Sequence, residues 1–440
     1  MNTYVQSAVH LDHHPSIALE DLKFCKLPTG FLFLVDEATG RIVEPVLLYL
    51  TERYLVRQGN VRPNTLRAAV YHLKDWWAYL AEFAKTWNEI DTEDVRFYRD
   101  AMLQTVSPKT HQPYDVGTVR RRLGTVLQFY EWARREGFYQ EILNPTSVRQ
   151  IARSRDLDAM AHLHASPIQR SGSDLLPLPR RGADDAVRPL TETEYRWLAH
   201  CLGPLPPGND ETVSDQRFCM DRLIAELSLH TGMRRDEITS LRLWQILDLR
   251  PEPSRPFAVL KMRLTQTKGL RPRTVFLPNW LAVALQWYVE HERKAALRLA
   301  KSQNPGALQK EPSALFLNGV NAGRHAGKPL QNGTVDGHFR QAVFAAGLTH
   351  TVHKTDPVSG EHYSGQAPNH VFHDLRHTFA VWMYQFEKAQ GNAEPWKKIQ
   401  ARLGHQALST TTGLYLRAAD DFEARVSDAM MKFFEGMRHE

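Results

Sequence analysis

The sequence is poor in cysteine and contains no long apolar run. Its three cysteines, Cys25, Cys201 and Cys219, are too few and too widely spaced for a disulfide framework or a zinc site, so we expect reduced, buried thiols. No stretch approaches the roughly 18 consecutive apolar residues of a membrane-spanning helix. The first residues also lack the basic and apolar segments of a secretory signal. These absences predict a cytoplasmic protein with no membrane partner.

The charge balance is only mildly basic. Lys and Arg number 55 against 49 Asp and Glu, which gives a formal net charge of +6 and a sequence pI of about 9.1. Such a balance permits a polyanionic partner only where positive charge is locally concentrated. The length of 440 residues is enough for two or three domains, each with its own core.

Helical periodicity dominates the first third of the chain. Residues 1–42 show no strong period apart from an apolar run at 31–35, and we treat them as an N-terminal arm. Within 43–145, apolar residues recur at helical spacing in four stretches. These stretches begin near Val46, Thr65, Asp91 and Val116. The pattern predicts a helical domain over 43–145.

A change of composition separates this region from a second domain. Residues 146–189 are rich in serine, glycine, proline and arginine, which predicts a linker. Thr191 and Glu194 then fit a capping box, in which each side chain satisfies a backbone N–H at the start of a helix. We place the second domain over 190–440. Two strands, 257–265 and 273–277, are expected inside it, joined across Lys268 and Gly269.

Three motifs in the second domain stand out. They are Thr231-Gly232-Met233-Arg234, His373-Asp374-Leu375-Arg376-His377-Thr378 and Leu403-Gly404-His405, and Tyr415 follows the last. His373 and Arg376 are three residues apart, which places both side chains on one face of a helix. Together the motifs resemble the active site of the tyrosine recombinases, the phage integrase family. In that pattern the first arginine after Thr-Gly, Arg234 rather than Arg235, is the catalytic one.

The resemblance covers residues 43–145 weakly and 190–425 strongly. It implies a mainly α fold with a small antiparallel β-sheet in the catalytic domain: a helical, SAM-like core-binding domain followed by an integrase-type catalytic domain. The apolar spacing beyond about residue 421 predicts a C-terminal helix, which either docks on a neighbouring protomer or folds back on its own domain. The arm, the linker and a polar insertion at 349–369 have no assigned counterpart.

The resemblance also implies strand transfer without metal, ATP or any cofactor. The catalytic set would be Arg234, Lys268, His373, Arg376, His405 and Tyr415. The two arginines and His405 would hold the negative charge that develops on the phosphate. Tyr415 would form a 3′-phosphotyrosyl link, helped by His373, while Lys268 would protonate the leaving 5′ oxygen. Glu237 would match the acidic residue that supports the site without itself contacting the phosphate. The candidates for DNA binding are Arg120, Arg121, Arg122, Arg271 and Arg273.

Structural alternatives exist for several of these residues. Glu237 is also placed for a simple i,i+3 helix charge pair, Lys268 for an exposed turn, and His405 for a capping or core histidine. His405 and Tyr415 are ten residues apart, one more than is common in the family, and a bulge at 412–413 would absorb the difference. The competing tyrosines are Tyr384, in an apolar helix, and Tyr363, in the polar insertion.

The expected function is site-specific recombination of double-stranded DNA, which integrates, excises or resolves a mobile element or replicon. The expected partners are specific recombination sites, three further copies of the chain in a homotetramer, and accessory DNA-bending or directionality proteins. The protein would be nucleoid-associated when it acts. A type IB topoisomerase and a catalytically silent DNA-binding regulator are the alternatives. A metal-dependent nuclease built on His10, His13 and His14 lacks an ordered carboxylate framework.

Overall fold

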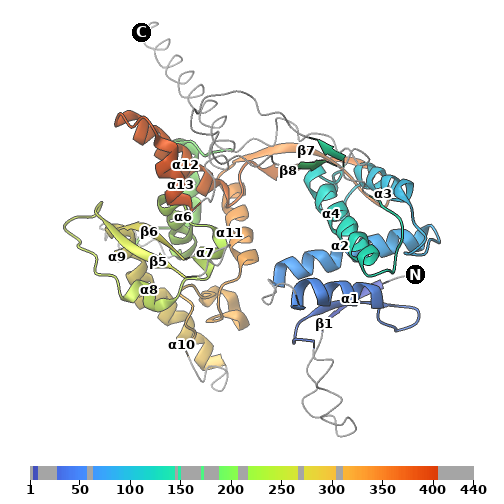
Figure 1. Ribbon diagram of the computed structural model, residues 1–440. Helices are drawn as coiled ribbons and strands as arrows, with labels where there is room; N and C mark the ends of the chain where they lie inside the picture. The colour runs from blue at the N-terminus through green and yellow to red at the C-terminus, as the bar shows by residue number, and fades with distance from the viewer. Residues whose placement is uncertain are drawn as a thin grey trace. The chain divides into compact units, whose positions relative to one another are not determined.

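The computed structural model describes residues 3–7, 27–56, 63–143, 147–149, 170–172, 188–206, 217–265, 272–303 and 311–404. The chain forms two compact units, the first comprising 1–182 with 353–363 and the second 183–352 with 364–440. Figure 1 shows that helices dominate both, and the sheets of the described residues are all two-stranded. The predicted mainly α fold is confirmed. In the described part of the chain, no helix is both long and apolar enough to cross a bilayer.

The described residues of the first unit contain four α-helices, where the sequence predicts four amphipathic stretches. They are α1 (Glu44–Thr51), α2 (Pro63–Glu82), α3 (Thr92–Gln104) and α4 (Val116–Arg135), and a π-helical turn, η2 (Glu52–Val56), follows α1. The side chain of Asp91 caps α3 by accepting from the N–H of Asp94 at 3.0 Å. Buried aromatic rings meet edge-on in the core between the helices, Trp76 against Tyr130 and Trp77 against Phe129.

Parts of the predicted arm and linker also contain regular structure. Strand β1 (Thr3–Ser7) pairs antiparallel with β2 (Leu32–Asp36), and Phe31 and Leu34 enter the same core as the helices. Strand β3 (Ser147–Arg149) pairs with β4 (Arg170–Gly172). No strand is predicted at β3 or β4, because three-residue strands are too short to show a period of two.

The second unit holds the motif residues. Its elements are α5 (Glu192–Leu202), α6 (Met220–Thr231), α7 (Arg235–Thr239), α8 (Leu243–Leu247), β5 (Val259–Leu264), β6 (Arg273–Pro278), α9 (Asn279–Tyr288), η5 (Val289–Arg293), α10 (Lys294–Gln303), η6 (Val320–His325), α11 (Asn332–Ala345), α12 (Asp374–Ala389) and α13 (Pro395–Leu403). The predicted capping box opens α5: Thr191 Oγ1 accepts from the N–H of Glu194 at 3.2 Å, and the Glu194 carboxylate accepts from the N–H of Thr191 at 2.7 Å. The largest apolar core of this unit is formed by buried residues that range in sequence from Leu190 to Leu375.

The predicted hairpin between the first two arginine motifs is confirmed. Strands β5 and β6 pair antiparallel from Val259 opposite Pro278 to Leu264 opposite Arg273. This register leaves the chain between Leu264 and Arg273 as the connecting turn. Lys268 and Arg271 fall between these two positions in the sequence and lie outside the described residues.

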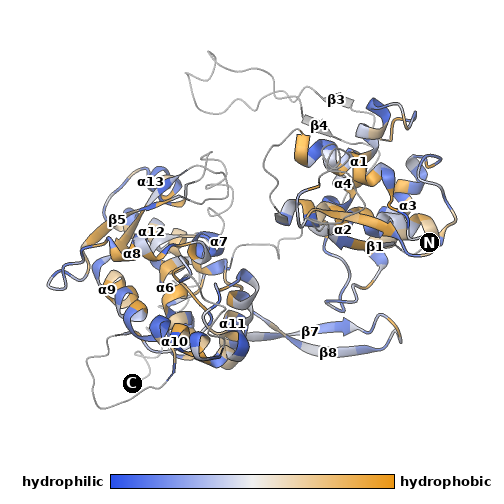
Figure 2. Ribbon diagram, turned by 90° about the horizontal axis from the view of Figure 1, so that it is seen from below, coloured by the Kyte–Doolittle hydropathy of each residue, from blue (hydrophilic) through white to orange (hydrophobic). Residues whose placement is uncertain are grey.

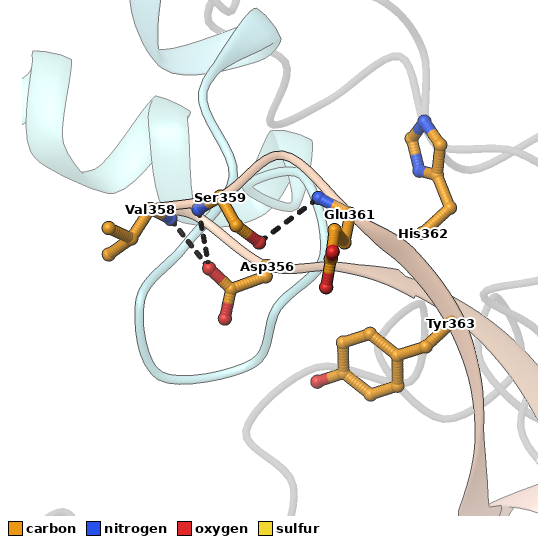
Figure 3. Close-up of a pocket in the computed structure, with 6 residues that line it drawn as sticks. All are labelled: Asp356, Val358, Ser359, Glu361, His362 and Tyr363. Carbon is orange, nitrogen blue, oxygen red and sulfur yellow. Dashed lines mark hydrogen bonds between the residues drawn. The ribbon is translucent and has the colours of Figure 1, made fainter.

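The polar insertion forms a hairpin of β7 (Thr349–Thr355) and β8 (His362–Pro368), which the sequence did not predict. Figure 2 shows both strands in blue and pale colours, with a short orange stretch where the hairpin turns. The tip, 353–363, belongs to the first unit, where the hydroxyl of Tyr363 lies 2.8 Å from Nδ1 of His111. In the turn drawn in Figure 3, Asp356 accepts from the N–H groups of Ser359 and Val358, and these bonds lower the pKa of its carboxyl.

Candidate active site

The first motif begins where α6 ends, at a glycine that the packing requires. Gly232 adopts a left-handed conformation, with φ of 64°, and closes the helix as its C-cap. A β-carbon at this position would come within 2.7 Å of the Phe379 ring and 2.8 Å of the Leu403 side chain. Glycine therefore lets the chain turn close beneath α12 and α13 and emerge at Arg234.

Arg234 stands at the N-terminus of α7 and is held by Glu237. The Glu237 carboxylate accepts from the backbone N–H of Arg234 at 2.8 Å and from its Nη1 at 3.2 Å. The side chain of Glu237 is 1 % exposed and that of Arg234 24 %. Burial raises the pKa of Glu237, but hydrogen bonds and charge from Arg273 and Arg234 outweigh it and leave that pKa below its ordinary value. Glu237 thus makes an i,i+3 helix contact with Arg234, and its buried carboxylate also holds the Arg234 side chain in place.

Arg376 joins the three motifs. It lies in the first turn of α12 and is 1 % exposed. Its Nη1 donates to the carbonyl of Gly232, and its Nη2 donates to the carbonyl of Leu403 at 2.7 Å. One guanidinium from the second motif therefore bonds to a backbone oxygen of the first and of the third, although Gly232 lies 144 residues away in the sequence.

The histidines of the second motif differ in exposure. His373 is exposed and immediately precedes α12, whereas His377 is buried one turn later. Their rings meet edge-on with centroids 4.7 Å apart. Of the competing tyrosines, Tyr384 is buried and stacks on Trp396 at 4.3 Å, which confirms its interpretation as a core residue.

Arg273 occupies a different environment from the one that the sequence suggested. It was expected beside Arg271 as a contact to the DNA backbone, yet its side chain is only 12 % exposed. Its Nη2 and Nε donate to the Glu237 carboxylate at 2.7 and 3.3 Å. Its Nη1 donates to the carbonyl of Arg402 at 2.5 Å. Contact with DNA stays a prediction for Arg273, while the geometry favours an internal role.

The burial of Arg273 leaves a signal in the sequence. On a strand, residues two apart share one face, and Arg273 alternates in this way with Val275 and Leu277, which are buried. Arg402 was also missed, because it contributes a backbone carbonyl, which does not depend on a distinctive side chain. Gly404, the glycine of the third motif, makes a left-handed turn with φ of 67°.

The three candidate arginines of the first unit lie on α4. Arg120 and Arg121 are exposed, and Arg121 donates to the hydroxyl of Thr118 at 3.0 Å. Arg122 is less exposed, because it pairs with Asp75 at 3.0 Å and covers the ring of Tyr114. Their contact with DNA stays a prediction.

Several predicted residues lie outside the described part of the chain. They are Lys268, Arg271, His405, Tyr415, the helix beyond residue 421, and His10, His13 and His14. In the portion that is described, no group of three or more His, Cys, Asp or Glu side chains is arranged to hold a metal ion. The roles assigned to these residues remain predictions.

Comparisons with known proteins agree with the motifs. The model of the phage integrase family matches residues 209–421, and that of the phage integrase N-terminal SAM-like domain matches 51–137. Tyrosine recombinase XerC of Lactobacillus delbrueckii subsp. bulgaricus is 25 % identical over 81 % of this chain and 90 % of its own length. Transposase A from transposon Tn554 of Staphylococcus aureus is 22 % identical over 93 % of this chain and 96 % of its own.

Among solved structures, the Tn1549 transposon integrase in complex with transposon right end DNA is 15 % identical, with a TM-score of 0.47. The alignment covers 86 % of this chain and 98 % of the integrase chain. The assignment of the family rests on the two family models and the curated relatives. With the Thr-Gly-x-Arg, His-x-x-Arg and Leu-Gly-His motifs in contact, they show that this chain belongs to the phage integrase family, the tyrosine recombinases, enzymes that cut and rejoin DNA strands without metal or ATP.

Proposed function

We propose that this protein is a site-specific DNA recombinase that uses Arg234, Arg376 and His405 to bind the scissile phosphate and Tyr415 to cut the strand. The observation that carries the proposal is the position of the Arg376 guanidinium, which bonds to the carbonyls of Gly232 and Leu403. This arrangement supports a single phosphate site built by three motifs. Near-complete burial keeps water from screening the charge of Arg376.

The cationic site matters because tyrosine is a weak nucleophile at neutral pH. An unperturbed tyrosine has a pKa near 10, so Tyr415 has to lose its proton as it attacks. His373, which is exposed and immediately precedes α12, would assist that transfer. Lys268, in the β5–β6 turn, would protonate the leaving 5′ oxygen. The 3′-phosphotyrosyl link keeps the free energy of the phosphodiester, so a 5′-hydroxyl of a partner strand can reverse the attack.

The partners follow from this chemistry. Strand exchange requires two double-stranded sites, and four protomers supply one nucleophile for each strand. We therefore propose a homotetramer on paired recombination sites, with accessory DNA-bending or directionality proteins as further partners. The similarity to a transposase supports the proposal that the protein recombines the DNA of a mobile element. The comparisons do not favour the topoisomerase or the silent regulator.

A nicked suicide substrate tests the nucleophile. The full-length protein should form a covalent adduct that resists denaturant, and Tyr415→Phe should abolish the adduct while DNA binding persists. Tyr384→Phe is the matched control, because it removes only the hydroxyl of a buried ring. An adduct that survives Tyr415→Phe and disappears in Tyr384→Phe would contradict our treatment of the ten-residue interval. Products exchanged between two sites, rather than resealed single strands, separate a recombinase from a topoisomerase.

A further inference from the structure

We propose that Arg273 is a positioning residue, which holds the phosphate-binding Arg234 and the turn that leads to His405 in one fixed arrangement. This inference rests on the function proposed above and assigns a role to a residue outside the three motifs. Arg273 opens β6 with its side chain turned toward the core face of the hairpin. It does not have to touch the phosphate to act, because one of its contacts is to the carboxylate that holds Arg234 and the other is to the helix that precedes His405 in the sequence.

The first contact is a forked ion pair with Glu237. Nη2 and Nε of Arg273 meet the two carboxylate oxygens at 2.7 and 3.3 Å, the two-point geometry that suits a guanidinium. The same oxygens hold the backbone N–H and Nη1 of Arg234 at 2.8 and 3.2 Å. Arg273 therefore fixes the carboxylate that in turn fixes Arg234.

The second contact is to the end of α13. Nη1 of Arg273 donates to the carbonyl of Arg402 at 2.5 Å, in the last turn of the helix, where carbonyls lack partners within the helix. The neighbouring carbonyl, that of Leu403, is held by Arg376. Two guanidinium groups thus hold the helix end from which the chain proceeds to His405.

The path of Arg273 also explains the glycine of the third motif. A β-carbon on Gly404 would lie 2.8 Å from Cδ of Arg273, and the φ of 67° at Gly404 disfavours any other residue. The Arg273 side chain therefore passes directly against the turn before His405. Lysine could replace it only in part, because a single ammonium group can pair with Glu237 but cannot form the forked pair and also reach the carbonyl of Arg402 in another direction.

The test compares Arg273→Met and Arg273→Lys with two control arginines in full-length protein. Arg263→Met alters an exposed arginine on the same hairpin, one residue from the buried Leu264. Arg293→Lys alters a buried arginine that bonds to the carbonyls of Pro312, Ala314 and Leu315, in the same unit but outside the motif cluster. Single-turnover cleavage of the suicide substrate is measured at saturating DNA, at a temperature at which circular dichroism shows every variant folded. The Kd for DNA is measured over a range of salt concentrations.

We expect Arg273→Met to slow cleavage by about 100-fold, the scale for misplacing catalytic groups by about 1 Å, and Arg273→Lys to recover part of that loss. The Kd and its salt dependence should stay at the wild-type values. Arg293→Lys should lower the melting temperature yet keep the cleavage rate, and Arg263→Met should keep it too. Combined with Glu237→Gln, Arg273→Lys should cause little further loss, because the two residues act as one unit.

Three results would overturn the proposal. A weaker Kd with a shallower salt slope and an unchanged rate at saturating DNA would make Arg273 a contact to the DNA backbone. If Arg293→Lys slowed cleavage as much as Arg273→Met does, the effect of the Arg273 substitution would be explained by general destabilisation. If the losses in cleavage rate from Arg273→Lys and Glu237→Gln added up fully in the double variant, the two residues would not act as one unit. The wild-type adduct and its loss in Tyr415→Phe test the proposed function separately, since neither depends on Arg273.

Discussion

Replacing Glu237 by glutamine should destabilise the catalytic unit far more than a single hydrogen-bonding change would suggest. The Glu237 carboxylate accepts four N–H bonds, two from Arg234 and two from Arg273, and is 1 % exposed. Glutamine keeps one acceptor oxygen and turns an amide NH2 toward the guanidinium groups. The substitution leaves two cations close together with no anion between them.

Removing one partner from a buried ion pair typically costs about 3 kcal/mol or more. In a domain of this size, about 1 kcal/mol corresponds to roughly 2–4 °C, so we expect the melting temperature to fall by roughly 6–12 °C. Glu192→Gln is the matched control. Glu192 pairs with Arg196 on the surface, with both side chains more than 70 % exposed, and its loss should shift melting by no more than about 2 °C.

Scanning calorimetry at several pH values gives the test. The pKa of Glu237 is lower in the folded protein than its ordinary 4.5. Its contribution is therefore fully present above that value and is lost as the pH falls through the lower folded pKa. The gap in melting temperature between wild type and Glu237→Gln should be full at pH 7 and shrink under acid conditions. A gap no larger than that of Glu192→Gln, or one that does not change with pH, would refute the reasoning.

Other perturbations probe the chemistry and the assembly. Arg234→Ala and Arg376→Ala should each slow cleavage at least about 100-fold, with EDTA having no effect, and a strict need for a divalent metal would contradict this mechanism. Lys268→Ala should cleave ordinary DNA slowly but a substrate with a bridging 5′ sulfur at nearly the wild-type rate; equal defects would mean that the lysine only positions DNA. Deleting residues 421–440 should leave a folded, DNA-binding protein that assembles poorly into tetramers on paired sites and does not recombine. Insolubility of this truncated protein, or normal recombination, would contradict docking on a neighbour.

The sequence predicted elements whose signals are local. The capping box at Thr191, the four helices of the first unit and the β5–β6 pair each depend on residues within a few positions of one another, and the structure contains all of them. The burial of Arg273 is also encoded locally, because Arg273 alternates with the buried Val275. The basic residues beside it in the sequence instead led to the prediction of an exposed contact to DNA. The exposed hairpin of the polar insertion has little apolar alternation to reveal its strands.

The partners of the site residues could not be predicted from local signals. Arg376 and Arg273 bond to the carbonyls of Gly232, Leu403 and Arg402, and every residue type carries the same backbone carbonyl. Only the folded chain determines which carbonyls come within reach of a guanidinium. The motif residues were thus recognisable one by one, whereas the hydrogen bonds that join them were not.

The long separations within the site determine when it forms during synthesis. Arg273 and its acceptor Arg402 are 129 residues apart, and Arg376 reaches back 144 residues to Gly232. Domains fold from the N-terminus as the ribosome releases them, so the core of the first unit can form early, whereas the arginines of the second acquire these acceptors only after residue 403 has emerged. A nascent or prematurely terminated chain that ends before residue 402 can therefore fold its first core but lacks the hydrogen bonds that join Arg273 and Arg376 to the end of α13.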